Sequence, residues 1–144
     1  MNFKTIIIRL YYMLIYSDGK VNQGEISLGK KMIEAEGISD SEFNVQIEAL
    51  KKKDTAAIYK ECLVDLKRLK SDLQIRSIAW MCVLANSDGF MDKAEWQFIY
   101  KIYHKELQLP LDDIMEVQKE LAKVTRDNSV FLTSTLPVNR ASNF

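Results

Sequence analysis

Apolar residues recur along most of the chain at intervals of three and four positions, which is the spacing of amphipathic helices. The stretch from Ile78 to Ala85 is apolar on every side, as is typical of a helix buried all round. No pair of segments with strand-like alternation is present. The predicted helices cover approximately Phe3–Tyr16, Gln23–Glu36, Asp40–Lys51, Thr55–Lys70, Ser71–Ala85, Lys93–Leu107 and Pro110–Val124. The pattern predicts an all-α domain of about seven helices around a central buried helix.

Residue types at the segment ends support these boundaries. Gly37 stands where a left-handed residue would end the second helix. Ser39–Glu42 and Ser71–Gln74 have the spacing of capping boxes, with an N-cap serine and an acid or amide three residues later. Asp54 is a suitable N-cap for the fourth helix, and Pro110 suits the first turn of the seventh.

The composition limits the classes of partner. The 144 residues contain 20 Lys and Arg and 20 Asp and Glu, so the net charge of zero argues against nucleic-acid binding. The apolar start, Met1–Tyr16, is too short to span a bilayer and contains Arg9, so we expect a core helix and no membrane span. Cys62 and Cys82 form no disulfide framework, which fits a cytoplasmic protein. We expect a helical domain over residues 1–125 and a polar tail over 126–144.

An internal repeat carries the acidic residues. Ser17–Glu25 and Ser87–Glu95 both read S-D-G-x-apolar-(N/D)-x-x-E, at an offset of seventy residues. Each copy follows an apolar helix and precedes an amphipathic one. The chain is therefore predicted to contain two copies of a helix–acidic loop–helix unit.

Helix capping alone explains part of this repeat. An asparagine or aspartate at an N-cap with a glutamate at the third helical position needs no ligand. The residues at these places are Asn22, Glu25, Asp92 and Glu95. Capping does not explain Asp18 and Asp88, which follow the C-terminal ends of helices, where the helix dipole disfavours a carboxylate. A compensating cation would explain both.

The repeat also matches the second half of an EF-hand loop, D-G-x5-E. The aspartate that opens such a loop is missing, because Leu14 and Leu84 stand at that place. One half loop has too few oxygen ligands, but two facing half loops could supply a full set. Oxygen ligands favour a hard divalent cation, Ca²⁺, Mg²⁺ or Mn²⁺. The candidate ligands are Asp18, Asn22, Glu25, Asp88, Asp92 and Glu95.

Paired S-D-G-x5-E motifs seventy residues apart in an all-helical chain resemble the TerB-like tellurite-resistance domain. The resemblance covers roughly Phe3 to Val124, and its most specific parts are Ser17–Gly19 with Glu25 and Ser87–Gly89 with Glu95. It implies a seven-helix bundle whose acids can bind a divalent metal, in a bacterial stress response. It implies no known reaction.

The function expected from the sequence is therefore cation binding between the two motifs, which would stabilise a surface for a partner protein. The alternative is an interaction module without metal, in which the acids are helix caps. A metal-dependent hydrolase is a third, weaker reading, because the sequence contains no catalytic motif and its only histidine is His104. We expect no enzyme activity, no catalytic residue and no cofactor besides the cation.

Overall fold

The computed structural model describes residues 2–16, 23–87 and 92–130, and all structural statements below concern these residues. The helices are α1 Phe3–Tyr16, α2 Gln23–Ala35, α3 Asp40–Leu50, α4 Thr55–Lys67, α5 Ser71–Ala85, α6 Lys93–Tyr100, the π-helix η1 Lys101–Glu106, and α7 Leu111–Val130. The described part of the chain contains seven α-helices and no strand. The all-α prediction is confirmed.

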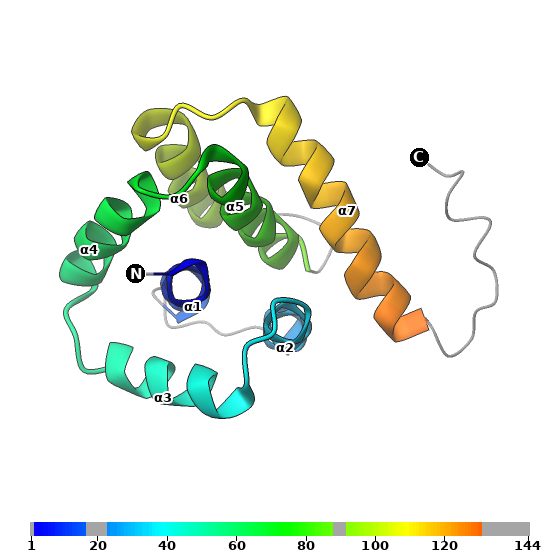
Figure 1. The fold of residues 1–144 in the computed structure, drawn as a ribbon, viewed down its shortest axis with the longest axis horizontal. Coiled ribbons are helices and arrows are strands. Elements are labelled where there is room, and N and C mark those ends of the chain that lie inside the picture. The colour runs from blue at the N-terminus through cyan, green and yellow to red at the C-terminus, as the bar shows by residue number, and fades with distance from the viewer. Residues whose placement is uncertain (1, 17–22, 88–91, 131–144) are drawn as a thin grey trace.

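Two helices form the centre of the bundle. Figure 1 shows α1 end-on, with α2, α3, α4 and α5 around it, while α7 packs along α5. Every residue of α5 from Ser77 to Ala85 is buried, as the unbroken apolar stretch predicts. The face of α1 that includes Ile6, Leu10 and Leu14 is buried too. The predicted central helix α5 is therefore confirmed, and α1 shares the core with it.

The architecture extends the sequence repeat beyond the two motifs. Helix α2 begins at Gln23 and α6 begins at Lys93, seventy residues later. Helix α1 packs against α3, and the corresponding helices α5 and α7 also pack against each other. The chain therefore consists of two related halves, α1–α2–α3 and α5–α6–η1–α7, with α4 between them.

Local residue chemistry sets several helix ends as predicted. Gly37 has φ 72°, and the next amide, of Ile38, donates to the carbonyl of Ile33 at 2.8 Å, which closes the end of α2. The Ser39 hydroxyl accepts from the amide of Glu42 at 3.1 Å, and the Asp54 carboxylate caps α4 in the same manner.

One predicted capping box and one predicted helix end are wrong. Helix α5 begins at Ser71 itself, with Lys70 at the N-cap and no capping side chain. The Gln74 amide, predicted to close a capping box, instead donates to the carbonyl of Leu66 at 3.0 Å and so joins α5 to the end of α4. Helix α7 continues to Val130, six residues past the predicted end, since no glycine or proline interrupts it there.

The predicted sixth helix changes type within its length. After Tyr100 the backbone widens into η1, and the amide of Leu107 donates to the carbonyl of Ile102 at 2.9 Å. Gln108 follows with φ 53°. Within this segment the rings of Tyr100 and His104 stack at 4.6 Å between centroids.

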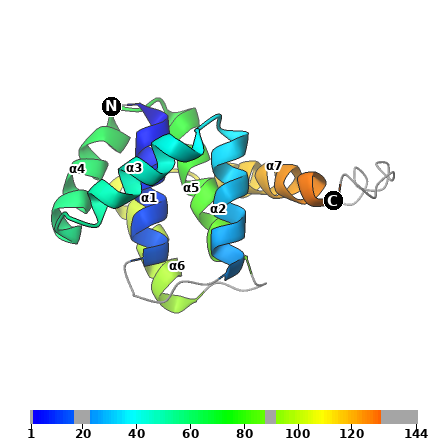
Figure 2. The same cartoon turned by 90° about the horizontal axis from the view of Figure 1, so that it is seen from below.

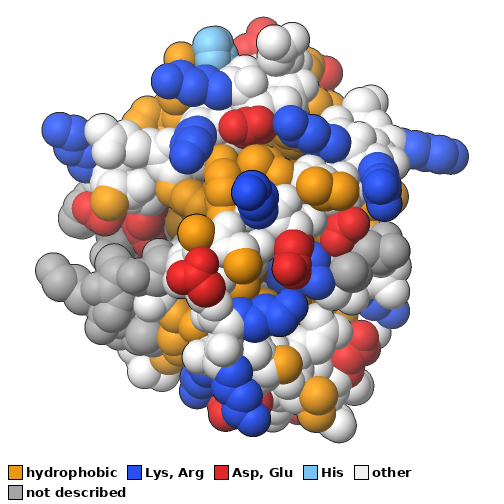
Figure 3. Space-filling model, turned by 90° about the vertical axis from the view of Figure 1, so that its left-hand side faces the viewer, with side chains coloured by type: hydrophobic (Ala, Val, Ile, Leu, Met, Phe, Trp, Pro, Cys, Tyr) orange, Lys and Arg blue, Asp and Glu red, His pale blue; other side chains and the backbone are white. Residues whose placement is uncertain are grey.

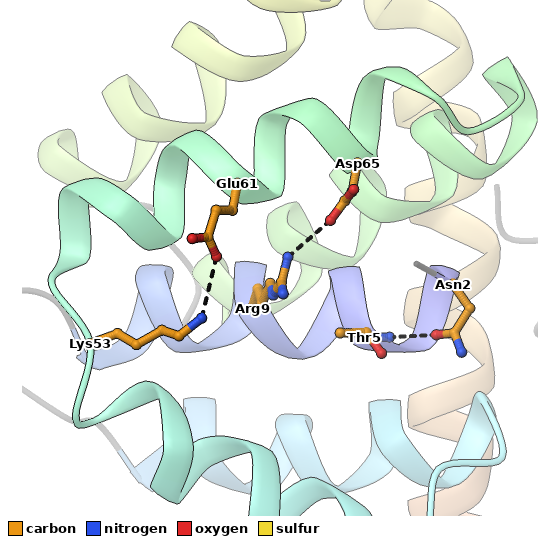
Figure 4. Close-up of polar contacts among 6 residues, drawn as sticks. All are labelled: Asn2, Thr5, Arg9, Lys53, Glu61 and Asp65. Atoms are coloured by element: carbon orange, nitrogen blue, oxygen red, sulfur yellow. Dashed lines mark hydrogen bonds and ion pairs between the residues drawn. The ribbon is translucent and has the colours of Figure 1, made fainter.

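Polar contacts join neighbouring helices. Arg9 of α1 pairs with Asp65 of α4 at 3.1 Å, and both side chains are largely shielded from solvent (Figure 4). The neighbouring pair, Lys53 and Glu61 at 3.3 Å, is half exposed and contributes less. On the face drawn in Figure 3, charges of both signs alternate around exposed hydrophobic side chains, with no block of one sign. This distribution fits the net charge of zero.

Candidate cation site at the paired motifs

Three of the six candidate ligands lie in the described part of the chain. Glu25 and Glu95 are each the third residue of their helix, α2 and α6, as predicted. Asp92 immediately precedes α6. The other three, Asp18, Asn22 and Asp88, lie outside the described residues. The prediction that the carboxylates of Asp18 and Asp88 lie near one another therefore stays a prediction.

Residues of the two motifs do meet in the fold. Gly24 of the first motif and Ser87 of the second line one cavity of about 460 Å³ between α2, α5 and α7. Lys31 fixes one wall of this cavity, because its ammonium donates to the backbone carbonyl of Thr125 at 3.2 Å. Figure 2 shows α1 ending, and α2 beginning, at the end of the bundle where α6 lies. The fold therefore brings the flanks of both motifs to the same end.

The Ser87 side chain stands out within this cavity. Its hydroxyl oxygen is buried and has no hydrogen-bond partner among the described residues. A buried hydroxyl without a partner is costly, and such atoms commonly belong to sites that bind water or an ion. Ser87 is the first residue of the second motif, and the cavity that it lines also includes Lys31 and Arg126 but none of the described acids.

The glutamate of the first motif is deeply buried. Glu25 is only 4% exposed. Beside it in the fold lies Tyr11 of α1, whose ring edge packs on the backbone of Gly29, one turn after Glu25 in α2. Burial, and then the nearby charges of Tyr16 and Glu25, raise the pKa of Tyr11 to about 12. The carboxylate and the tyrosine hydroxyl are thus within electrostatic reach of each other.

The described acids of the second motif are more exposed than Glu25. Asp92 is exposed and occupies the N-cap of α6 with φ −67° and ψ 148°, but its side chain makes no capping hydrogen bond. Asp92 stands at the predicted N-cap position, but the predicted capping hydrogen bond is absent. Glu95 is half-buried, and the neighbouring Trp96 is 38% exposed.

The described residues do not form a complete metal site by themselves. Within residues 2–16, 23–87 and 92–130, no three His, Cys, Asp or Glu side chains group so that they could hold a metal ion. The oxygen ligands that are described, Glu25, Asp92 and Glu95, suit a hard cation by their chemistry. They make at most part of a site.

Other reactive groups are held in inert surroundings. Cys62 and Cys82 are free and buried, and burial raises the pKa of each thiol to about 12, so both are protonated at neutral pH. The imidazole of His104 stacks on Tyr100. These side chains offer no activated nucleophile.

The contact between Tyr11 and Gly29 was not predicted from the sequence. The helical spacing of the tyrosines placed them with the core, and nothing in that pattern links Tyr11 to a glycine eighteen residues later. One signal was present. A glycine inside a helix costs about 1 kcal/mol relative to alanine, so Gly29 in the middle of α2 indicates a close approach by another group.

These features define a class of protein: an all-α domain of two related halves, each carrying an acidic motif between its first two helices in the sequence. The chain belongs to the TerB family, described as tellurite resistance protein TerB, whose profile matches residues 4–130. The predicted resemblance is thereby confirmed. No curated protein and no solved structure matches the chain. None of the described helices is long and apolar enough to cross a membrane.

Proposed function

We propose that this TerB-family domain binds a hard divalent cation, Ca²⁺, Mg²⁺ or Mn²⁺, between its two motifs. Its function is binding and not catalysis. When bound, the cation supplies positive charge that holds several carboxylates together. The ligands, or the residues next to them, are Asp18, Asn22, Glu25, Asp88, Asp92 and Glu95.

The observation that carries this proposal is the cavity shared by Gly24 and Ser87. One motif resembles half of a calcium-binding loop and has too few oxygens for an independent site. A fold that brings the flanks of both motifs to one cavity supplies the condition for a shared site. The Asp92 carboxylate supports the same conclusion, because it is not used as a helix cap.

A cation at this place would join the two halves of the fold. Glu25 belongs to the first half, and Asp92 and Glu95 belong to the second. A shared ion would stabilise α2 against α5 and α6, and so present one defined surface to a partner protein. The free buried thiols fit a reducing compartment, and we place the protein in the cytoplasm.

Calorimetric titration of chelator-treated protein with each of the three ions tests the proposal. A ligand at a hundred times its Kd adds about 2.7 kcal/mol to the free energy of unfolding, so millimolar ion should raise the melting temperature by several degrees. Glu95→Gln should strongly reduce the rise in melting temperature. The matched control Glu116→Gln, at an exposed position of α7, should not. Wild-type melting that is indifferent to all three ions up to tens of millimolar would support the metal-free interaction module instead.

A further inference from the structure

We propose that the cavity between α2, α5 and α7 binds a small phosphorylated molecule, with its phosphate group held by Lys31 and Arg126. This inference is independent of the proposed cation binding, because the described acids of the two motifs do not line the cavity. The volume of about 460 Å³ lies in the range of sites that bind small molecules. In Figure 1, α7 passes beside α5 and reaches α2, so that all three helices border this site.

Basic side chains supply the charge in this cavity. Among the described residues that line it, the charged ones are Lys31 and Arg126. A second hollow along α7 shares Arg126 with the cavity and adds Lys119, again with no described acid in its lining. The chain as a whole has as many acids as bases. The excess of positive charge at this place therefore favours an anionic ligand.

The fold holds Lys31 in position. Its ammonium donates to the backbone carbonyl of Thr125 in α7 at 3.2 Å, and the residue is partly buried. An ammonium group has three N–H donors, so others remain for a ligand. Gly24, Ser27 and Lys31 follow one another at spacings of three and four residues, which places them on one face of α2. A cation anchored between two helices loses little further side-chain freedom when a ligand binds.

Neutral hydrogen-bonding groups complete the polar wall. The Ser87 hydroxyl is buried and has no hydrogen-bond partner among the described residues. The neighbouring Asn86 amide donates to the carbonyl of Cys82 at 3.2 Å, which fixes its orientation. Gly24 is the second residue of α2, so the positive end of this helix dipole lies at the cavity. A phosphate group has enough oxygens to accept from several of these donors, and it would give Ser87 the partner that it lacks.

The remaining walls are apolar. Leu28, Val83 and Ala122 line the cavity, and Met115 of the adjoining hollow is 47% exposed. A free phosphate ion would leave these side chains in contact with water, whereas an organic group attached to the phosphate would cover them. We therefore expect a phosphate ester to bind more tightly than inorganic phosphate.

Calorimetric titration of the metal-free, 144-residue chain with phenyl phosphate tests the proposal. Lys31→Met keeps the length of the side chain and removes its charge, and we expect it to weaken binding about tenfold or more. Lys31→Arg keeps the charge and should retain most of the affinity. Lys30→Met is the matched control, because Lys30 is the adjacent residue but lines a different cavity, between α2 and α3. This control should bind as wild type does.

A second variant keeps the test decisive if Lys31→Met does not fold. Arg126 is exposed, so Arg126→Gln should leave the fold intact and should also weaken binding about tenfold. Thermal melts identify the variants that are folded. Phenyl phosphate that binds equally well to wild type and to either of these folded variants would overturn the inference, and so would an equal loss in the Lys30→Met control.

Two further probes identify the chemical class of the ligand. Inorganic phosphate should bind more weakly than phenyl phosphate, and benzyl alcohol, which carries no charge, should not bind measurably. Inorganic phosphate that binds as tightly as the ester would overturn the assignment of an organic ligand, and benzyl alcohol that does so would overturn the assignment of an anion. Because these titrations contain no divalent cation, their outcome is separate from that of the proposed cation binding.

Discussion

The two halves of the molecule share a motif but differ in how they enclose it. In the first half, Tyr11 covers Gly29 and Glu25 is buried. In the second half, Met81 and Ile99 occupy the equivalent places, and Glu95 is half-buried. The first half thus pairs a large tyrosine with a glycine, whereas the second half has two side chains of intermediate size at these places. The comparison shows that a repeated sequence motif fixes the positions of acids in helices but not their exposure, which residues outside the motif determine.

The same contrast recurs at the ends of these helices. Glu36, just after α2, accepts from Arg76 at 2.7 Å and from the Trp80 indole at 2.6 Å. Glu106, seventy residues later at the end of η1, pairs with Lys67 at 3.2 Å, where the lysine is half exposed. The first half thus contributes its acid to a shielded network that reaches α5. In the described part of the second half, Glu106 pairs only with a half-exposed lysine.

The largest expected effect on stability comes from replacing Gly29 by isoleucine, the residue type that stands at the equivalent place in the second half. Gly29→Ile should lower the free energy of unfolding by about 3 kcal/mol or more, because the new side chain collides with the Tyr11 ring. Adding Tyr11→Met should recover at least about 1 kcal/mol of that loss. Urea denaturation measures both changes. Strictly additive losses would show that the two positions do not compensate each other.

The next effect is a pH dependence that comes from Tyr11 of the first half. The pKa of Tyr11 is about 12 in the folded protein against 10.0 ordinarily, so the folded state holds this proton more tightly. The free energy of unfolding should therefore be unaffected below pH 10 and should fall between pH 10 and 12, by no more than about 2.7 kcal/mol. Tyr11→Phe should fall less over the same interval. The buried thiols are common to both proteins, so their contribution cancels, and parallel curves would contradict the prediction.

A smaller effect separates Glu36 from Glu106, the glutamates near the ends of α2 and η1. Glu36→Gln should cost about 1.5–2 kcal/mol, since it removes a charge that accepts two short hydrogen bonds. Glu106→Gln should cost less than about 1 kcal/mol, because it loses a single ion pair to a half-exposed lysine. Thermal melts of the two variants at the same pH make the comparison. Equal losses would mean that shielding of the acid has no influence here.

The smallest effect concerns the caps. Asp54→Ala should cost about 1 kcal/mol, because its carboxylate accepts from the amide of Ala57 at 3.2 Å. Asp92→Ala should cost less than about 0.5 kcal/mol in metal-free protein, because its side chain makes no such bond. Chemical denaturation in the presence of chelator measures both. A loss at Asp92 as large as that at Asp54 would restore the capping interpretation of the second motif.

Much of the fold follows from the sequence because helical periodicity and end signals are local. Gly37, Ser39 and Asp54 act on their own helix ends, and their predicted roles are confirmed. The capping box predicted at Ser71 is wrong because the Gln74 side chain bonds to the neighbouring helix α4. Local spacing does not reveal such a contact. The same limit applies to the site. The helical places of Glu25 and Glu95 were predictable, but the contact of Gly29 with Tyr11 joins two helices and was not.

The π-helix η1 explains why the two halves remain comparable despite unequal length. Helix α6 starts seventy residues after α2, but the left-handed residues Gly37 and Gln108 are seventy-one apart, and so are the starts of α3 and α7. The second half therefore has one more residue between these points. Inserted into a regular α-helix, that residue would turn everything after it by about 100°. The widened turn of η1 accommodates it instead, and α7 still packs against α5.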